Sequence, residues 1–316
     1  RSFLITAALA AASLSPVMAQ MPQPPEIAAR AYLLMDVTTG QVLAAKDADT
    51  PVEPASLTKL MTAYLTFKSL KNGQLKPNQA VPVSVAAWKT GGSKMFIAPD
   101  KPVTVDELIR GMIIQSGNDA CVALAEVIAG SEEAFAQMMT REAQRLGMTG
   151  TQYRNANGLT EAGHFTTARD LSLLARALIR DFPEYYGLYS TLDYTYNNIK
   201  QGNRNRLLTM DRSVDGMKTG HTDAAGWCLV SSAKREDRRV VSVLLGAPNE
   251  KGRIESSATL LNYGFNAWEN ARLASAEEVL ATPAVYKGAA ASVQVGTADD
   301  AVVTVPRGQA GKVTRE

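Results

Sequence analysis

Cysteine and histidine are scarce in this chain of 316 residues, with two of each. Both cysteines, Cys121 and Cys228, lie in apolar runs, so we interpret them as small buried hydrophobic residues rather than as a disulfide. The two histidines, His164 and His221, are too few for a metal site with several histidine ligands. We therefore predict neither a metal nor another cofactor.

An excess of charge of one sign is also missing. Lys and Arg total 33 and Asp and Glu total 31, which leaves a formal net charge of +2. Such a balance gives no electrostatic basis for binding nucleic acid or a strongly acidic partner. We expect no nucleic-acid partner.

Long hydrophobic runs are absent except at the N-terminus. Arg1 precedes an apolar stretch at residues 3–14, and a Val-x-Ala pattern ends at Ala19. A basic start, a short apolar core and small residues before the cleavage point are typical of a secretory signal. The stretch is too short to span a bilayer comfortably. We predict a signal peptide at residues 1–19 and an exported protein, located in the periplasm or cell wall.

Strand patterns lie toward both ends of the chain, with helical patterns between them. Residues 31–36 and 41–45 predict a hairpin, and residues 226–234 and 239–246 predict two further strands. A closing helix is predicted at residues 253–268. This order indicates an α+β fold, in which N- and C-terminal strands form one antiparallel sheet backed by a helical block.

Apolar alternation without a helical period resumes after residue 280. We interpret residues 279–316 as the beginning of a small β-rich C-terminal domain that the sequence leaves incomplete. Residues 20–278 then form the main domain.

The first chemical motif is Ser-x-x-Lys, at Ser56 and Lys59. Residues three apart share one face of a helix, so the hydroxyl and the amine would lie side by side at a helix N-terminus. Unpaired backbone N–H groups there favour developing negative charge. A serine becomes a nucleophile when a base removes its proton, and burial can lower the pKa of a lysine enough for that role. The alternative is a plain amphipathic helix start.

A second Ser-x-x-Lys occurs at Ser231 and Lys234, within a predicted strand. Positions three apart on a strand point to opposite faces of a sheet. That serine and lysine therefore cannot cooperate, and the copy at Ser56 is the better candidate.

A second polar cluster, Ser116 and Asn118, lies in a break between two predicted helices among apolar neighbours. Buried polar groups need hydrogen-bond partners. One interpretation is that either residue caps the helix predicted to begin at Asp119. The functional interpretation is that Ser116 relays a proton near Lys59 and that Asn118 binds a substrate carbonyl.

The tripeptide Lys-Thr-Gly occurs at residues 89–91, where we expect a solvated turn, and again from Lys218 at the start of a predicted strand. A strand beside a cleft can pair with an extended peptide, and Gly220 would allow a close approach. Lys218 and the hydroxyls of Thr219 and Thr222 could bind an anion. The alternative is an ordinary turn at a strand end.

With these three clusters in this order, the chain resembles the active-site-serine penicillin-recognising enzymes. Within that group it resembles the low-molecular-weight penicillin-binding proteins, specifically the serine-type D-alanyl-D-alanine carboxypeptidases. The resemblance covers residues 30–316 and implies a β-lactamase/transpeptidase-like fold. Its specific pointers are residues 54–62, 110–111, 115–120, 203–205 and 214–222.

The resemblance implies catalysis through an acyl-enzyme. Ser56 would attack the carbonyl of the penultimate D-Ala of a peptidoglycan stem peptide, Lys59 would take its proton, and Ser116 would relay the proton to the leaving D-Ala. The oxyanion hole would be the backbone N–H groups of Ser56 and His221. β-Lactams should trap Ser56. The terminal carboxylate would be bound by Lys218, Thr219 and Thr222, with Arg204 and Arg253 as weaker candidates.

Alternative functions also follow from the motifs. A D,D-endopeptidase that cleaves peptidoglycan cross-links shares them, whereas a class A β-lactamase would need a Glu-x-x-Leu-Asn sequence that is not found here. A non-catalytic wall-binding module is the third alternative. The family usually ends in an amphipathic membrane-anchoring helix, so association with the inner membrane through a further C-terminal segment is also expected. The group that activates the deacylating water is left open.

Overall fold

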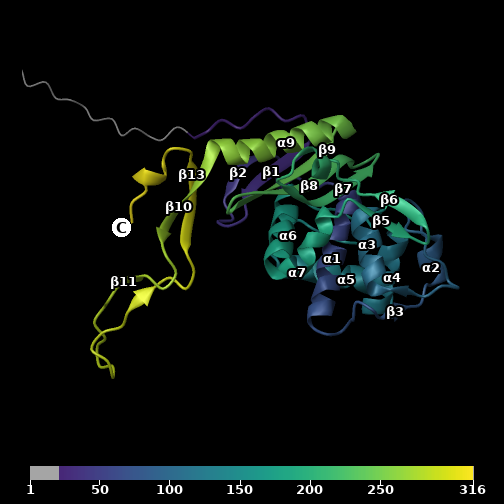
Figure 1. Cartoon of the computed structure of the whole chain (residues 1–316), viewed down its shortest axis with the longest axis horizontal. Helices are drawn as coiled ribbons and strands as arrows, with labels where there is room; N and C mark the ends of the chain where they lie inside the picture. The colour runs from purple at the N-terminus through teal and green to yellow at the C-terminus, as the bar shows by residue number, and fades with distance from the viewer. Residues whose placement is uncertain (1–20, 316) are drawn as a thin grey trace, which may run out of the picture.

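The computed structural model describes residues 21–315, so the predicted signal peptide lies outside the described residues. Its centre is an antiparallel five-stranded sheet with strand order β2-β1-β9-β8-β7 (Figure 1). The predicted N-terminal hairpin is confirmed, and its first strand pairs with the last strand of the C-terminal set. The strands are β1 (Ala31–Asp36), β2 (Val42–Lys46), β7 (Val214–Thr222), β8 (Gly226–Arg235) and β9 (Arg238–Ala247).

Helices cover both faces of this sheet, because side chains along each strand alternate between two hydrophobic cores (Figure 1). On β1, for example, Leu33 belongs to the core under the helical block and Leu34 to the core under α9. The predicted α+β arrangement is therefore confirmed. The main helices are α1 (Lys59–Lys71), α3 (Val105–Ile114), α4 (Asn118–Ala129), α5 (Glu132–Arg145), α6 (Ala168–Asp181) and, on the opposite face, α9 (Glu250–Ala267).

Shorter elements connect these helices and strands. Thr104 and Glu107 form the predicted capping box at the start of α3: the backbone N–H of Thr104 donates to Glu107 Oε2 at 2.8 Å. The remaining elements up to β7 are η1 (Ala55–Thr58), β3 (Ala80–Val81), α2 (Val85–Lys89), β4 (Val103–Thr104), α7 (Pro183–Tyr186), η2 (Gly187–Ser190), β5 (Asp193–Tyr196), β6 (Ile199–Gly202) and α8 (Leu207–Met210).

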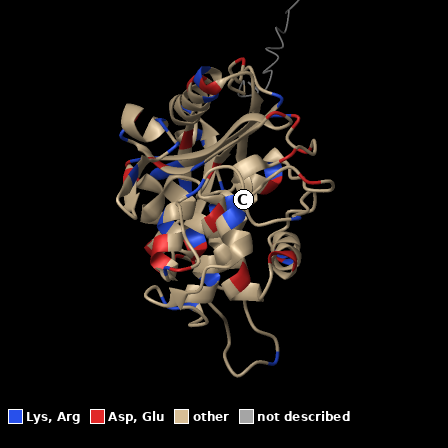
Figure 2. Ribbon diagram, turned by 90° about the vertical axis from the view of Figure 1, so that its right-hand side faces the viewer, with Lys and Arg blue, Asp and Glu red and all other residues tan. Residues whose placement is uncertain are grey.

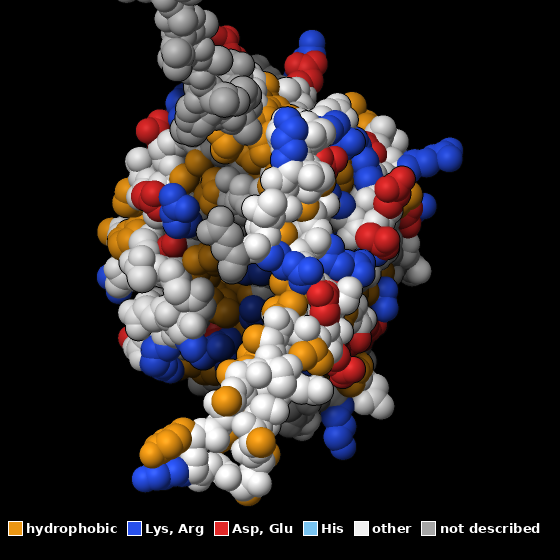
Figure 3. Space-filling model, turned by 90° about the vertical axis from the view of Figure 1, so that its left-hand side faces the viewer, with side chains coloured by type: hydrophobic (Ala, Val, Ile, Leu, Met, Phe, Trp, Pro, Cys, Tyr) orange, Lys and Arg blue, Asp and Glu red, His pale blue; other side chains and the backbone are white. Residues whose placement is uncertain are grey.

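A separate strand region follows α9 and lies beside the main sheet in Figure 1. Strand β10 (Trp268–Ala274) pairs with β13 (Ala301–Pro306), and β11 (Val279–Ala281) pairs with β12 (Val295–Gly296); a short helix, η3 (Ala310–Lys312), follows. These strands begin ahead of the boundary predicted at residue 279, and the domain division stays a prediction. Hydrophobic side chains lie exposed along the protruding part of this region (Figure 3).

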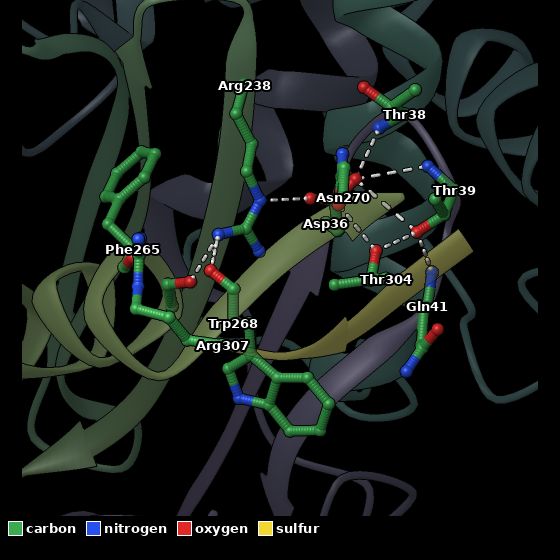
Figure 4. A network of polar contacts seen from close by, with 11 residues as sticks. Asp36, Thr38, Thr39, Gln41, Arg238, Phe265, Trp268, Asn270, Thr304 and Arg307 are labelled. Carbon is green, nitrogen blue, oxygen red and sulfur yellow. Dashed lines mark hydrogen bonds and ion pairs between the residues drawn. The ribbon is translucent and has the colours of Figure 1, made fainter. Parts of the chain in front are cut away.

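A buried polar network joins the main sheet to this C-terminal region (Figure 4). Asp36, which is 0% exposed, accepts a hydrogen bond from Arg238 Nε at 2.8 Å and from two backbone N–H groups of the following turn. Arg238 also donates to backbone carbonyls near the end of α9 and at the start of β10. Across the same junction, the hydroxyls of Thr39 and Thr304 lie 2.7 Å apart. Elsewhere basic and acidic side chains are interspersed over the ribbon (Figure 2), as the balanced composition predicts.

Candidate active site

Ser56 and Lys59 lie side by side at the junction between η1 and α1. Lys59 Nζ is 2.8 Å from Ser56 Oγ, as the spacing predicts. The serine is half-buried. The lysine is only 2% exposed, although lysine side chains are ordinarily charged and lie at the protein surface. Burial lowers the pKa of the Lys59 amine to about 8, against smaller opposite effects of Cys121 and Asp119. The amine can therefore be neutral, and accept a proton from its neighbour, at a much lower pH than an exposed lysine would need.

The lysine amine has two further partners. It donates to Asn118 Oδ1 at 2.7 Å and to the backbone carbonyl of Asn157 at 2.5 Å. Asn118 was among the predicted site residues, but the carbonyl of Asn157 was not. Groups from η1, from the start of α4 and from the loop that contains Asn157 thus all contact the Lys59 amine.

Ser116 and Asn118 do not cap α4. The helix begins at Asn118, its N-cap is Gly117, and no side-chain capping bond is present there, so the capping interpretation is wrong. Asn118 Nδ2 instead donates to the carbonyl of Gly91 at 2.8 Å. The amide is thus occupied by Lys59 on one side and by a neighbouring loop on the other.

The backbone of Ser116 has a φ of +66°, a left-handed conformation that is uncommon for a residue with a side chain. Its hydroxyl makes no hydrogen bond with any residue in the range 21–315, and the residue lines the same cleft as Ser56. Backbone strain of this kind concentrates at functional sites, where the rest of the fold holds it. The hydroxyl is therefore available to a bound molecule.

Asp119, next to this cluster, is fully buried and binds the backbone of residues 95–97. Its carboxylate accepts the backbone N–H groups of Met95 and Phe96, both at 2.9 Å, and of Ile97 at 3.3 Å. Sequence reasoning placed Asp119 only as the start of a helix. No local signal pointed to its role, because its partners are more than twenty residues away in the chain.

The strand β7 brings its Lys-Thr-Gly segment against the serine. A Cβ on Gly220 would lie 3.2 Å from the carbonyl oxygen of Pro54 and 3.3 Å from Ala55 Cβ, so the glycine lets the strand pack on η1. Lys218 is 3% exposed, and burial, together with the charge of Lys59, lowers its pKa well below the ordinary value. The segment thus places a second buried amine beside the first.

Of the two predicted residues at the end of β7, His221 and Thr222, only His221 lines the cleft. His221 is exposed, stacks on Trp227 with ring centroids 4.1 Å apart, and lines the cleft. The hydroxyl of Thr222 accepts the backbone N–H of Ala225 at 3.0 Å, and Thr222 is not among the residues that line the cleft. Thr222 therefore shapes the turn between β7 and β8.

The two arginines predicted to bind a carboxylate, Arg204 and Arg253, line the cleft at its other end. Arg204 is exposed and lines it. Arg253 is 4% exposed, its guanidinium lies 5.0 Å from the Trp227 ring centre, and Nη2 donates to Glu250 at 3.2 Å. Its Nε has no hydrogen-bond partner within the described part of the chain. Together these side chains give this end of the cleft a positive potential.

The cleft itself has a volume of about 430 Å³. Its walls come from η1, the break before α4, the edge strand β7 and the segment before α8. The residues that line it are Ser56, Ser93, Ser116, Asn203, Arg204, Arg206, Thr219, Gly220, His221, Trp227, Glu250 and Arg253. The structure thus brings all three predicted clusters to one place.

The remaining sequence predictions also find their place. Ser231 lies on β8, is fully buried and has its hydroxyl 2.8 Å from that of Ser242, while Lys234 is exposed, so this pair does not meet. Both cysteines are buried and free, as predicted.

Sequence reasoning missed a buried contact behind the serine. Nε2 of His164 lies 2.9 Å from the hydroxyl of Thr58, and burial, with a smaller effect of Arg154, lowers the pKa of His164 to about 4. The sequence around His164 contains no motif, and Thr58 is 106 residues away in the chain, so this contact could not be predicted.

The fold and this site define a class. A serine and a buried lysine at a helix start, beside the edge strand of an antiparallel five-stranded sheet, are the features of the active-site-serine penicillin-recognising enzymes, which have the β-lactamase/transpeptidase-like fold. Penicillin-binding protein 5 from Haemophilus influenzae matches the structure with a TM-score of 0.88 and 40% identity, over 92% of this chain and 86% of that one. Penicillin-binding protein D2 from Listeria monocytogenes, solved in an ampicillin-bound form, matches with a TM-score of 0.71 and 31% identity, over 77% of this chain and 100% of that one.

Sequence comparison identifies the family within this class. The profile described as D-alanyl-D-alanine carboxypeptidase matches residues 18–249, and that of the penicillin-binding protein 5 C-terminal domain matches residues 268–316. The D-alanyl-D-alanine carboxypeptidase DacC of Escherichia coli (strain K12) is 43% identical over 297 residues, which cover 92% of this chain and 74% of that protein. The chain belongs to the D-alanyl-D-alanine carboxypeptidase family.

Proposed function

We propose that this family member removes the terminal D-Ala from peptidoglycan stem peptides and that Ser56 is its nucleophile. The observation behind the assignment is the 2.8 Å contact between Ser56 Oγ and the amine of Lys59, whose pKa burial lowers to about 8. A serine next to a deprotonated amine is the activated nucleophile that acyl transfer requires.

In the first half of the reaction, Ser56 Oγ bonds to the carbonyl carbon of the penultimate D-Ala while its proton passes to Lys59. The backbone N–H groups of Ser56 and His221 stabilise the oxyanion. The close packing of β7 on η1 at Gly220 supports this pairing. The C–N bond then breaks as Lys59 returns the proton to the hydroxyl of Ser116, which passes its own proton to the nitrogen of the leaving D-Ala. The free hydroxyl of Ser116 in the cleft supports that role.

The substrate is held by charge at one end and by its backbone at the other. The carboxylate of the terminal D-Ala binds between Thr219, Arg204 and Arg253, which line the cleft, with Lys218 buried on the same strand as Thr219. The edge strand β7 offers its backbone to the extended peptide. Asn118 contributes by orienting Lys59, since its amide is already occupied.

In the second half, water attacks the acyl-enzyme carbonyl and the ester bond to Ser56 breaks. One proton of the water returns to the Ser56 oxygen, and the shortened peptide leaves as a carboxylate with release of the other proton. β-Lactams acylate the same serine, and the ampicillin-bound form of the Listeria protein supports this. Because the substrate lies in the cell wall, the protein works after export. The described residues include no helix long and apolar enough to cross a membrane. Association with the inner membrane stays a prediction.

A fluorescent penicillin tests the nucleophile. We expect labelling of the wild type and none of Ser56→Ala. Ser231→Ala is the matched control: it alters the other Ser-x-x-Lys of the chain, on β8, and should label normally. Release of D-Ala from a pentapeptide ending in D-Ala-D-Ala should follow the same pattern. Labelling that survives Ser56→Ala would refute the assignment.

A further inference from the structure

The direction of the Lys59 lone pair is set by two hydrogen-bond acceptors. A neutral amine has two N–H bonds and one lone pair. Asn118 Oδ1 and the carbonyl of Asn157 lie 2.7 and 2.5 Å from Nζ and each accept one N–H, while Ser56 Oγ lies at 2.8 Å. The lone pair is then left to face the serine hydroxyl. If either acceptor moved, the amine could rotate and point an N–H at the serine instead.

The Asn157 acceptor belongs to a loop without helix or strand structure, residues 155–158. The loop is closed by its own side chains: Asn155 Oδ1 accepts the N–H of Gly158 at 2.7 Å, and Asn157 Oδ1 accepts the N–H of Leu159 at 2.9 Å. These bonds give the loop its shape. They do not fix its distance from Lys59, which requires contacts with other elements.

Two side chains from other elements supply those contacts. Thr62, on α1, donates its hydroxyl to the carbonyl of Ala156 at 2.6 Å. Glu132, in the first turn of α5, accepts the backbone N–H of Ala156 at 2.9 Å and the side-chain Nδ2 of Asn157 at 3.2 Å, both through Oε1. One carboxylate oxygen therefore holds both Ala156 and the residue whose carbonyl meets Lys59. Bonds to an ionised acceptor are stronger than bonds between neutral groups.

We propose that Glu132 is a positioning residue for the catalytic base: through Ala156 and Asn157 it holds the Asn157 carbonyl against the amine of Lys59. Glu132 is not among the residues that line the cleft, and its hydrogen bonds go to the loop. The proposal rests on the proposed role of Lys59 as base. The Glu132 carboxylate thereby affects the acylation rate although only the loop connects it to Lys59.

The effect on pH dependence can be worked out. The Asn157 carbonyl stabilises the protonated amine more than the neutral one, because a cation donates the stronger hydrogen bond. Loss of this acceptor therefore lowers the pKa of Lys59 further. A variant that releases the loop should be slower at every pH, and its acidic limb should move to lower pH. Loss of stability alone would not shift that limb.

The test measures acylation by a fluorescent penicillin and D-Ala release from pH 6 to 10, with thermal unfolding of each variant. We expect Glu132→Ala to acylate about tenfold more slowly, a part of the ~10²–10⁴-fold that a general base contributes, with its acidic limb at lower pH. Glu132→Gln keeps an oxygen acceptor and should recover most of the rate. Glu133→Ala is the matched control, since Glu133 is the exposed acidic neighbour in the same helical turn, and it should behave like the wild type.

A second variant covers the case in which Glu132→Ala folds poorly. Asn157→Ala keeps the backbone carbonyl and removes the Nδ2 contact, so we expect a smaller loss with the same shift of the limb. The double variant, Glu132→Ala with Asn157→Ala, should lose less activity than the sum of the two single losses. Each substitution removes the same contact between Glu132 and Asn157. Wild-type acylation in Glu132→Ala, or a loss with an unmoved limb, would overturn the proposal. If Lys59→Ala also acylates normally, the proposed base itself is wrong; if only Glu132→Ala does, the positioning role alone fails.

Discussion

The amine of Lys59 has an unusually low pKa because the side chain ends in the protein interior. The amine lies in the interior of the protein, and burial lowers its pKa to about 8. Below that pH the amine is charged and cannot take the proton of Ser56. Above it the amine is neutral and can. The same side chain on the surface would need a pH above 10 to do so.

A pH profile tests this assignment. The acylation rate of the wild type should rise through the pKa of about 8 and then level off. Lys59→Ala should be slower by ~10²–10⁴-fold, the usual contribution of a general base, and should lack this rise. Stopped-flow acylation by a chromogenic β-lactam measures both.

Lys234→Ala serves as the control for that experiment, because Lys234 belongs to the second Ser-x-x-Lys and is exposed. Its profile should match that of the wild type. Near-normal acylation by Lys59→Ala would remove Lys59 from the mechanism.

The loop at residues 155–158 and the turn η1 are pressed together at Gly158. Its φ is +88°, and a Cβ there would lie 1.8 Å from the carbonyl oxygen of Ala55, the residue before Ser56. No side chain fits without moving the serine or the loop. The contact is part of how α1, η1 and this loop form one rigid site.

Replacement of this glycine should therefore affect both stability and catalysis. We expect Gly158→Ala to lower the free energy of unfolding by more than ~2 kcal/mol, from left-handed strain plus overpacking, and to slow acylation. Thermal or urea unfolding and penicillin labelling measure the two effects.

Gly130 offers the matched control, because its φ of +81° is similar but a Cβ there meets nothing within 4 Å. Gly130→Ala should cost only the strain, about 1–2 kcal/mol, and leave acylation unchanged. Equal losses in the two variants would show that the contact with Ala55 has no importance.

The junction between the main sheet and the C-terminal strands contains a buried ion pair. Asp36 is 0% exposed, and the Arg238 side chain that pairs with it is 13% exposed. Residue 238 begins β9, whereas the cleft lies near the other end of that strand, where Trp227 pairs with Ala247. The pair therefore supports the fold of the whole molecule rather than its chemistry.

Arg238→Met should leave the Asp36 carboxylate buried without its cation. We expect a loss of about 3–5 kcal/mol in the free energy of unfolding, typical of breaking a buried pair. Folded protein at low temperature should still acylate at the wild-type rate. Denaturant unfolding and penicillin labelling provide the two readouts.

Arg272→Ala is the control, since Arg272 lies in the same C-terminal region and forms an exposed pair with Asp300. Exposed pairs contribute at most about 1 kcal/mol. A comparable loss in both variants would contradict the importance given to burial.

The sequence by itself determined the features that depend on short separations along the chain. The three-residue spacing of Ser56 and Lys59 sufficed to bring hydroxyl and amine together on a helix start, and the same spacing on a strand excluded Ser231 and Lys234. The capping box of Thr104 could likewise be predicted. Helix and strand periods set the direction of each side chain locally, so no knowledge of the fold was needed.

Only the tertiary structure decided what surrounds those residues. The pKa of Lys59, the carbonyl that Asn157 presents to it and the hold of Glu132 on that loop all join segments far apart in the chain. The interpretation that Ser116 or Asn118 caps α4 was wrong for the same reason, because distant partners bind Asn118: Lys59 donates to its Oδ1, and its Nδ2 donates to Gly91. Burial and long-range contacts arise only when these segments pack, and no local pattern encodes them.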